Sequence, residues 1–482
     1  MEQRTTKPKR KEQTMNPLTQ FKKIRVLPVA IALLLVLGRA YAIDVSPDPV
    51  IRWSNEARKA IVPPSAGPEN YGRRGPSDAA VYMGIAHVAI YDAAVALEGG
   101  YEFYAQYDPP INVPPNTSAA AAIATAAHHT LIGLPCGLNT TEANTLTGIY
   151  DDYMNAIPDG EAKTNGIMVG ERVAGAIVAL RQNDGRCATP TFTPPPPLPG
   201  VWEPNPGNPP PPIVGLLLPG ITPLALESAS QFRPDGPNPL TSEEYAEDFN
   251  QVKELGRFDS TTRTPAQTMQ ALFWTDHDLR QWNDGMLRLV NNRGLDLVQA
   301  ARMLAMAHVS GGDAMIAGFE AKYHYLSWRP YRAIQRADED GNPDTEPDPT
   351  WAPLRTTPNH PEYPAAHAFH SSAVATALEA FFGTDRVAFY LDSRVPGATP
   401  RRDYARFHDA VKDVARARVL AGFHFRNSCQ EGENLGRMIG RYVNEHLFQP
   451  IIFLVRGRWD ELSKNLRFKI GQRKCGRAFW GG

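Results

Sequence analysis

The chain has 482 residues, enough to bury a large core, and its 42% hydrophobic and 21% charged residues are ordinary for a globular protein. This composition argues against global disorder, and a formal net charge of −1 gives no reason to expect nucleic acid as a partner. Four cysteines without a CxxC pair argue against a disulfide framework and a structural zinc site. One disulfide remains open, and the sequence does not reveal its pairing.

The N-terminus has the layout of a secretory signal peptide. Lys22, Lys23 and Arg25 precede an apolar run over 26–38, and a small-x-small cleavage motif ends at Ala42. We therefore expect a secreted or periplasmic protein cleaved near Ala42, with an uncleaved anchor as the alternative. No later segment reaches the roughly 18 apolar residues of a spanning helix, so no integral membrane domain is expected.

Residues 43–188 are predicted to be helical. Apolar and alanine-rich runs at helical spacing predict helices at 77–97, 118–134, 145–157 and 165–183. Almost nothing here alternates with period two, so sheet content should be low. His87 lies among Ala, Val and Ile and is interpreted as a core histidine rather than a ligand.

A proline-rich and glycine-rich segment interrupts this pattern within residues 189–240. Two runs of four prolines, at 194–197 and 209–212, alternate with glycines, so neither a helix nor a central strand can form there. The segment is either a lid that drapes over the surface or a linker between two helical halves. The sequence leaves both interpretations open.

Helices resume after a T-x-x-E capping signal at Thr241 and continue over residues 241–450. Their expected ranges are 264–275, 276–292, 296–317, 367–382, 403–420 and 432–447. The polar stretch 338–348 is interpreted as a solvated turn rather than a calcium loop, because its glycine is in the wrong position. The tail 451–482 is basic without a clear amphipathic period and is interpreted as an appended segment rather than a nucleic-acid patch.

These patterns predict an all-α fold, a large helical-bundle domain with long Pro-rich loops. Its expected parts are an N-terminal extension with the signal peptide, an N-terminal helical half, a loop segment, a C-terminal helical half and a basic tail. They cover residues 1–42, 43–188, 189–240, 241–450 and 451–482.

Basic and imidazole groups concentrate in three segments of the last third. In KYHYLSWRP, Lys322 and Arg329 are seven residues apart, which predicts that both cations share one helix face, and Pro330 places Arg329 near a helix end. Two like charges on one stripe repel each other unless an anion lies between them. Taken alone, this segment would be interpreted as a solvated basic face.

The second segment, HPEYPAAH, runs from His360 to His367. Pro364 fits the first turn of a new helix, so the backbone N–H groups of residues 365–367 would be free to bind an anion. In the third segment, Arg418 and His424 are about 120° apart on a straight helix. A bend at Gly422 could bring them together.

In this order the segments resemble the three-part signature of the vanadium haloperoxidase and type 2 phosphatidic acid phosphatase superfamily, which is KxxxxxxRP, PSGH and SRxxxxxHxxxD. This chain has KYHYLSWRP, PAAH and ARVLAGFHFRNS, with the same spacing in every block. The motifs lie within residues 322–428, and a looser resemblance to secreted haloperoxidase-like members extends across most of the mature chain. The resemblance implies a helical bundle of the vanadium haloperoxidase type.

The resemblance also implies vanadate as the cofactor and assigns roles to residues. Lys322, Arg329, Arg418 and the backbone of Ala366 would bind the oxyanion, because guanidinium forks and ammonium groups suit its oxygens. The metal ligand would be His424, which bonds to vanadium or, in a phosphatase, attacks phosphorus.

His367 would be the second catalytic histidine, acting as general acid and base. His360 and Phe319 are the halide-site candidates. Seven residues before the motif histidine, chloroperoxidases resemble one another in placing Phe and bromoperoxidases in placing His, and this chain has His360.

Four positions depart from the family pattern. Ala365 replaces a serine, a loss of about 1.5–3 kcal/mol if its hydroxyl is not replaced. Ala366 replaces a glycine, which would be strained if its φ were positive. Ala417 replaces the serine before the arginine. Ser428 replaces the closing Asp that helps to orient the histidine, which puts the basicity of His424 in doubt.

Three functions remain open from the sequence. The first is a vanadate-dependent haloperoxidase that uses hydrogen peroxide, bromide or iodide, and an organic acceptor. The second is a secreted acid phosphatase without a cofactor, with a phosphate monoester as substrate in the same pocket. The third is a catalytically weakened anion-binding relative. The sequence leaves the oligomeric state open.

Overall fold

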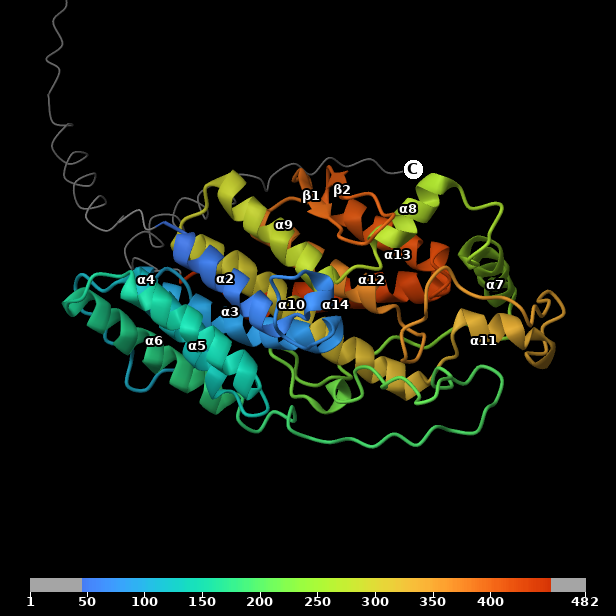
Figure 1. The fold of residues 1–482 in the computed structure, drawn as a ribbon, viewed down its shortest axis with the longest axis horizontal. Coiled ribbons are helices and arrows are strands. Elements are labelled where there is room, and N and C mark those ends of the chain that lie inside the picture. Colours follow the sequence, from blue (N-terminus) through green and yellow to red (C-terminus); the bar gives the residue numbers. More distant parts are fainter. Residues whose placement is uncertain (1–45, 452–482) are drawn as a thin grey trace, which may run out of the picture. The chain divides into compact units, whose positions relative to one another are not determined.

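The structure, a computed structural model, describes residues 46–451, which all fall within one compact unit. The predicted signal peptide and basic tail lie outside the described residues. Thirteen α-helices form most of this unit, so the all-α prediction is confirmed (Figure 1). They are α2 (Asp48–Ile61), α3 (Pro76–Glu98), α4 (Ala119–Gly133), α5 (Thr140–Asn155), α6 (Glu161–Leu180), α7 (Glu243–Gly256), α8 (Pro265–Phe273), α9 (Asp278–Arg293), α10 (Leu297–Tyr325), α11 (Pro330–Gln335), α12 (Ala366–Phe382), α13 (Phe407–Leu420) and α14 (Arg426–His446).

The described residues contain one two-stranded antiparallel sheet. It pairs β1 (Phe389–Asp392) with β2 (Arg401–Tyr404). The prediction of a helix from residue 403 was therefore wrong at its start. Tyr404 and Arg402 instead bind Asp413 on the following helix, so this stretch is held as a strand beside α13.

One hydrophobic core contains residues from both helical halves, and α3 packs along α10 at its centre (Figure 1). The helix α3 is long and apolar enough to cross a membrane by length and composition alone. The expectation that no segment after the signal peptide would meet this criterion was therefore wrong. In this structure, however, 89% of its most apolar 18-residue stretch is buried inside the protein.

Three glycines at four-residue spacing let α14 approach α12 closely. A Cβ atom on Gly436 would lie 2.2 Å from the carbonyl oxygen of Phe369, and one on Gly440 would lie 2.8 Å from that of Ala373. A Cβ on Gly432 would meet the carbonyl oxygen of Ala365 at 2.8 Å. This packing fixes the start of α12 beside the start of α14, where the second and third motifs lie.

Several predicted helix ends shift because capping groups were not recognised. The helix α5 begins earlier than expected because Asn139 and Glu142 form a capping box. The cap of α7 is Ser242, which accepts a hydrogen bond from the backbone of Tyr245, rather than Thr241. The helices α2 and α11 were not predicted, and α10 extends past the expected end at residue 317.

The Pro-rich segment is hydrogen-bonded to two of the motif-bearing stretches. The backbone N–H of Trp202 donates to the carbonyl of Leu326, within the first motif, at 2.6 Å. The Asn359 side chain accepts from the backbone of Asn205 at 2.7 Å and donates to the carbonyl of Pro211 at 2.8 Å. In Figure 1 the segment runs below α10 as a long green trace. The segment therefore lies along the helices, and its hydrogen bonds hold the loop that precedes α12 in place.

A disulfide joins Cys136, after α4, to Cys187, after α6. The thiol of Cys429, on α14, is free and buried. The single disulfide left open by the sequence therefore has a defined pairing, which joins the segments that follow α4 and α6.

Candidate functional site

Lys322 lies in the last turn of α10 and is fully buried. Its ammonium group donates to the backbone carbonyls of Pro361, Glu362 and Pro364, at 3.1, 2.8 and 2.5 Å. All three of its protons are thus taken by the stretch before α12. Burial first, and then the neighbouring arginines, lower its pKa well below the ordinary value.

The prediction that Lys322 and Arg329 share one helix face was wrong. Arg329 comes close to Lys322 through a turn that follows α10. The chain leaves α10 through Leu326 in the left-handed region (φ 49°), and Arg329 is the N-cap residue of α11, with Pro330 at the first turn. The expected position of Arg329 near a helix end is confirmed.

The Arg329 guanidinium is fully buried and contacts two of the predicted site residues. Its Nη1 lies 3.1 Å from His424 Nε2 and also donates to the carbonyl of Phe423 at 2.9 Å. Its Nη2 lies 3.0 and 3.1 Å from the two ring nitrogens of His360. Burial lowers the pKa of this arginine to about 9.

Arg418 occupies the last turn of α13, and its Nη1 donates to the carbonyl of Trp274 at 2.7 Å. Its Nε is buried and has no hydrogen-bond partner among the described residues. Gly422 then turns the chain with φ +76°, in a space where a Cβ would lie 2.6 Å from the carbonyl oxygen of Gly256. The predicted bend at Gly422 is therefore confirmed, and His424 follows it directly.

His424 is held at both ring nitrogens. Its Nδ1 lies 2.8 Å from Glu362 Oε1, while its Nε2 faces Arg329. Burial lowers its pKa well below the ordinary value, and Arg329, Lys322 and Arg418 lower it further. The ring is therefore neutral.

Glu362 is a site residue that sequence reasoning missed. It is 1% exposed, and burial raises its pKa to about 7 against the opposing effect of Lys322 and Arg329. The available signal was an acidic residue inside the second motif segment, HPEYP, at a position predicted to be near three cations.

The start of α12 differs in detail from the prediction. Pro364 precedes the N-cap residue Ala365 instead of lying in the first turn, and the Ala365 N–H donates to the carbonyl of Ser428 at 3.0 Å. Ala366 has an ordinary helical backbone without the positive φ that would strain it. No described residue accepts a hydrogen bond from the N–H of Ala366 or His367.

His367 lies beside a group of buried polar side chains at the start of α9. Asp278 is fully buried, and its Oδ2 lies 2.9 Å from His370 Nδ1. Burial raises the pKa of Asp278, but His367 and His370 outweigh that effect and hold it below its ordinary value. Burial, followed by Arg418, lowers the pKa of His367 to about 3, and its Nε2 has no hydrogen-bond partner among the described residues.

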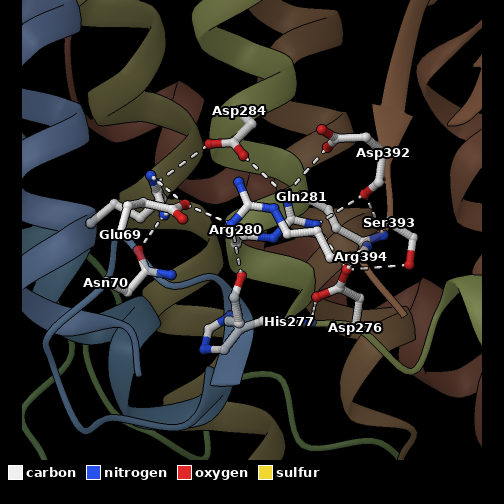
Figure 2. A network of polar contacts seen from close by, with 12 residues as sticks. Glu69, Asn70, Asp276, His277, Arg280, Gln281, Asp284, Asp392, Ser393 and Arg394 are labelled. Carbon is white, nitrogen blue, oxygen red and sulfur yellow. Dashed lines mark hydrogen bonds and ion pairs between the residues drawn. The ribbon is translucent and has the colours of Figure 1, made fainter. Parts of the chain in front are cut away.

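A network of ion pairs fixes the start of α9 (Figure 2). The Arg280 guanidinium donates to Asp276 at 2.8 Å and to Asp284 at 3.0 Å, and the backbone N–H of Arg394 also donates to Asp276. These contacts surround the turn that carries His277 and Asp278. The network therefore positions the residues behind His367, and no residue spacing in the sequence predicts it.

A cavity of about 610 Å³ opens onto this group. Arg418, His367, His277, Phe423 and Arg355 are among the residues that line it. Arg418 and His367 are thus the predicted site residues that border open space, while Lys322, Arg329 and His424 lie behind them, each at most 1% exposed.

The two halide-site candidates are adjacent to each other but do not line this cavity. The rings of Phe319 and His360 have their centroids 5.1 Å apart, and both side chains are buried. His360 contacts Arg329 through both nitrogens, and burial lowers its pKa well below the ordinary value. Their role in halide binding stays a prediction.

The residues present fit an oxyanion such as vanadate. Lys322, Arg329 and Arg418 are all buried, and none forms an ion pair with a carboxylate among the described residues. Taking a charge out of water costs several kcal/mol unless a counter-charge compensates it. Arg418 Nε and the free N–H groups at the start of α12 could donate to such an anion, while His424 Nε2 carries a lone pair. Within the described residues, no group of three or more His, Cys, Asp or Glu side chains could hold a metal cation.

The fold and the site define a helical-bundle protein with a buried cationic pocket. Residues 302–451 match the family model described as the VCPO second helical-bundle domain. Vanadium chloroperoxidase of Curvularia inaequalis is 28% identical over 150 residues, which cover 26% of this chain and 24% of that protein. The match therefore spans about a quarter of the relative's length.

Solved bacterial structures share the fold over nearly their whole length. A vanadium-dependent iodoperoxidase has a TM-score of 0.68 and 21% identity, covering 84% of this chain and 97% of its own. A vanadium-dependent chloroperoxidase in its apo form has a TM-score of 0.63 and 14% identity, covering 84% and 98%. The family match over residues 302–451 and the curated relative support a place in the vanadium haloperoxidase superfamily, and the solved structures show the same fold.

Proposed function

We propose that this protein is a vanadate-dependent haloperoxidase that oxidises bromide or iodide with hydrogen peroxide and so halogenates an organic acceptor. The observation that carries the proposal is the burial of Lys322, Arg329 and Arg418 around His424 without an ion-paired carboxylate in the described part of the chain. Such a pocket favours an anion, because no carboxylate in the described part of the chain pairs directly with any of the three buried cations.

Each residue has a distinct part in holding vanadate. Arg418 and the N–H of Ala366 supply free donors, whereas Lys322 and Arg329 supply mainly positive charge because the structure already occupies their protons. His424 Nε2 is the atom that would bond to vanadium. When bound, vanadate would supply the Lewis acidity that activates hydrogen peroxide toward halide.

His367 is the proton-exchanging residue of the proposal. It lines the cavity, and its Nε2 has no partner among the described residues, so a proton can be gained or lost there. Arg418 contributes to its low pKa, and an anion bound to Arg418 would weaken that effect. Burial is the largest cause of the low pKa of His367 and would remain, so a bound anion would raise that pKa from about 3 only by offsetting Arg418.

Fewer observations support the preference for bromide and iodide over chloride. This chain has His360 where chloroperoxidases place Phe, and a bacterial iodoperoxidase is among the solved structures that share its fold. Bromide and iodide are also easier to oxidise than chloride. We accordingly expect chloride to be a poor substrate.

We also propose that the protein is exported. The disulfide between Cys136 and Cys187 supports an oxidising compartment, where such bonds persist.

The decisive measurement is bromination and iodination of a phenol indicator with hydrogen peroxide, with and without added vanadate, at several pH values. Vanadate-dependent halogenation is the expected result. Its absence, together with vanadate-inhibited release of phosphate from an aryl phosphate, would establish an acid phosphatase instead. Tight binding of vanadate with neither activity would indicate an anion-binding relative without catalysis.

A further inference from the structure

The carboxylate nearest to His424 comes from a different part of the chain than the third motif predicts. Glu362, in the loop before α12, places Oε1 2.8 Å from His424 Nδ1 and 3.1 Å from the backbone nitrogen of Phe425. Both Glu362 and His424 are 1% exposed, and Glu362 also lines a separate cavity of about 330 Å³.

The contacts at the two ring nitrogens determine which one carries the proton. Arg329 has only donors, so His424 Nε2, 3.1 Å from Arg329 Nη1, must accept a hydrogen bond. The proton of the neutral ring is then on Nδ1, where Glu362 accepts it. The lone pair on Nε2 is therefore directed toward the cationic pocket.

Ser428 lies where the third motif of the superfamily has its closing Asp. It is four residues beyond His424, in the first turn of α14, is 1% exposed, and lies close enough to Glu362 to lower the pKa of that carboxyl group. A carboxylate on either residue 362 or residue 428 would therefore occupy the same small region behind the ring. The chain has one there, from the loop instead of the helix.

We infer that Glu362 is the positioning residue of His424, and that it replaces the Asp absent at Ser428. It acts by holding the Nδ1–H tautomer and the ring orientation, which keep Nε2 unprotonated and directed toward the cationic pocket. Carboxylate partners of ligating histidines are typically important for affinity, with losses of about 10- to 100-fold when they are removed. The inference rests on the proposed function only for the identity of the oxyanion, because the tautomer is a property of the protein alone.

Glu362 could instead serve only to cap the start of α14 through Phe425. The test must therefore read out the histidine as well as the stability of the protein. Nitrogen-15 NMR of histidine-labelled, anion-free protein distinguishes the two ring tautomers. Calorimetric titration with orthovanadate and with inorganic phosphate measures affinity, and thermal unfolding of the same samples verifies the fold.

The variants separate charge, contact and position. Glu362→Ala should convert the single His424 tautomer into a mixture and weaken vanadate affinity by about 10- to 100-fold. Adding Ser428→Asp to that variant should restore the Nδ1–H tautomer and at least a tenfold gain in affinity. Glu362→Gln keeps an acceptor oxygen and should keep the tautomer, but it should weaken vanadate affinity because an amide partner leaves Nε2 less basic than a carboxylate partner does. Glu247→Gln, at an exposed carboxylate on α7, is the matched control and should change neither.

Two results would overturn the inference. One is a folded Glu362→Ala protein with an unchanged tautomer and vanadate affinity. The other is a folded double variant in which Ser428→Asp recovers neither property. If Glu362→Ala does not fold, Glu362→Gln decides, because unchanged vanadate affinity would exclude a role for the charge. Failure of the wild type to halogenate would refute the proposed function but leave the tautomer measurement valid.

Discussion

Arg329 Nη1 lies 3.1 Å from His424 Nε2, so an arginine donor occupies the lone pair that would bond to the oxyanion. An arriving anion must displace this contact, and it receives the positive charge of the same guanidinium in return. The pairing keeps His424 Nε2 unprotonated in the anion-free protein. Affinity for the anion is therefore a balance between breaking this hydrogen bond and compensating three buried cations.

The two arginines should differ in what their removal costs. Arg418→Ala should weaken vanadate or phosphate affinity by about 2–5 kcal/mol, because it removes a buried charge and its free Nε donor. Arg329→Ala should weaken affinity similarly and also lower the melting temperature, because its guanidinium holds the carbonyls of Pro358 and Phe423. Calorimetric titration and thermal unfolding measure the two effects. Arg441→Ala, at an exposed position of α14, is the control, and parental affinity in both site variants would place the pocket elsewhere.

Acid should destabilise the protein through its buried histidines, with His87 as the clearest case. Burial lowers the pKa of His87 from 6.5 to about 4, and its ring contacts the carbonyl of Met83 and the hydroxyl of Ser54. Between pH 6.5 and pH 4, His87 binds a proton in the unfolded chain but not in the folded protein. The free energy of unfolding therefore falls as the pH drops from 6.5 to 4, by roughly 3 kcal/mol for this group.

Chemical denaturation at pH 7, 6, 5 and 4 tests this pH dependence. His87→Gln should be less stable than the wild type at pH 7 but should lose less stability on acidification. Its anion affinity at pH 7 should stay at the parental value, because the residue lies in the core. The exposed His446→Gln should follow the wild type at every pH, and parallel curves for all three proteins would contradict the assignment.

The helices could be predicted from the sequence because apolar spacing and caps are local. The pairing of β1 with β2 could not, since RRDY carries no strand pattern and depends on contacts with Asp413. The exact route from Lys322 to Arg329 was also missed. Lys322 and Arg329 were expected on one helix face, whereas Leu326 between them takes a left-handed conformation that no pattern in the sequence predicts.

The charged and imidazole side chains of the candidate site could be predicted, because the three motifs contain them. Lys322, Arg329, Arg418 and His424 gather as buried neighbours because three motif segments end at one place. Glu362 was missed because its partner His424 is 62 residues away in the sequence. The third motif instead predicts the carboxylate at the position of Ser428. A long-range hydrogen bond of this kind follows from packing, which no local spacing encodes.

Reducing agents should destabilise the protein by opening one bond. Cys136 and Cys187 are 51 residues apart in the sequence. For a loop of this length, the loss of chain entropy in the unfolded state stabilises the folded protein by about 4 kcal/mol. Cys187→Ser should lower the denaturation midpoint and make it insensitive to dithiothreitol. Cys429→Ser should retain the sensitivity to reductant, because that thiol is free and buried. Equal midpoints of the wild type with and without reductant would show that the bond contributes no stability.

The two catalytic candidates, His367 and His424, should separate into different functional losses. His424 is buried between Glu362 and Arg329 and offers only its Nε2 lone pair, so His424→Ala should reduce vanadate affinity far more than phosphate affinity. His367 borders the cavity and has an unpartnered Nε2, so His367→Ala should keep most vanadate affinity and lose turnover by roughly 100- to 10,000-fold, the usual contribution of a general acid or base. Calorimetric titration with both anions and halogenation rates as a function of pH measure this separation. The remaining activity of His367→Ala should also lose any pH dependence that comes from this residue. Equal losses of vanadate affinity in the two variants would mean that His367 binds the anion directly, and the division of roles between the two histidines would then be wrong.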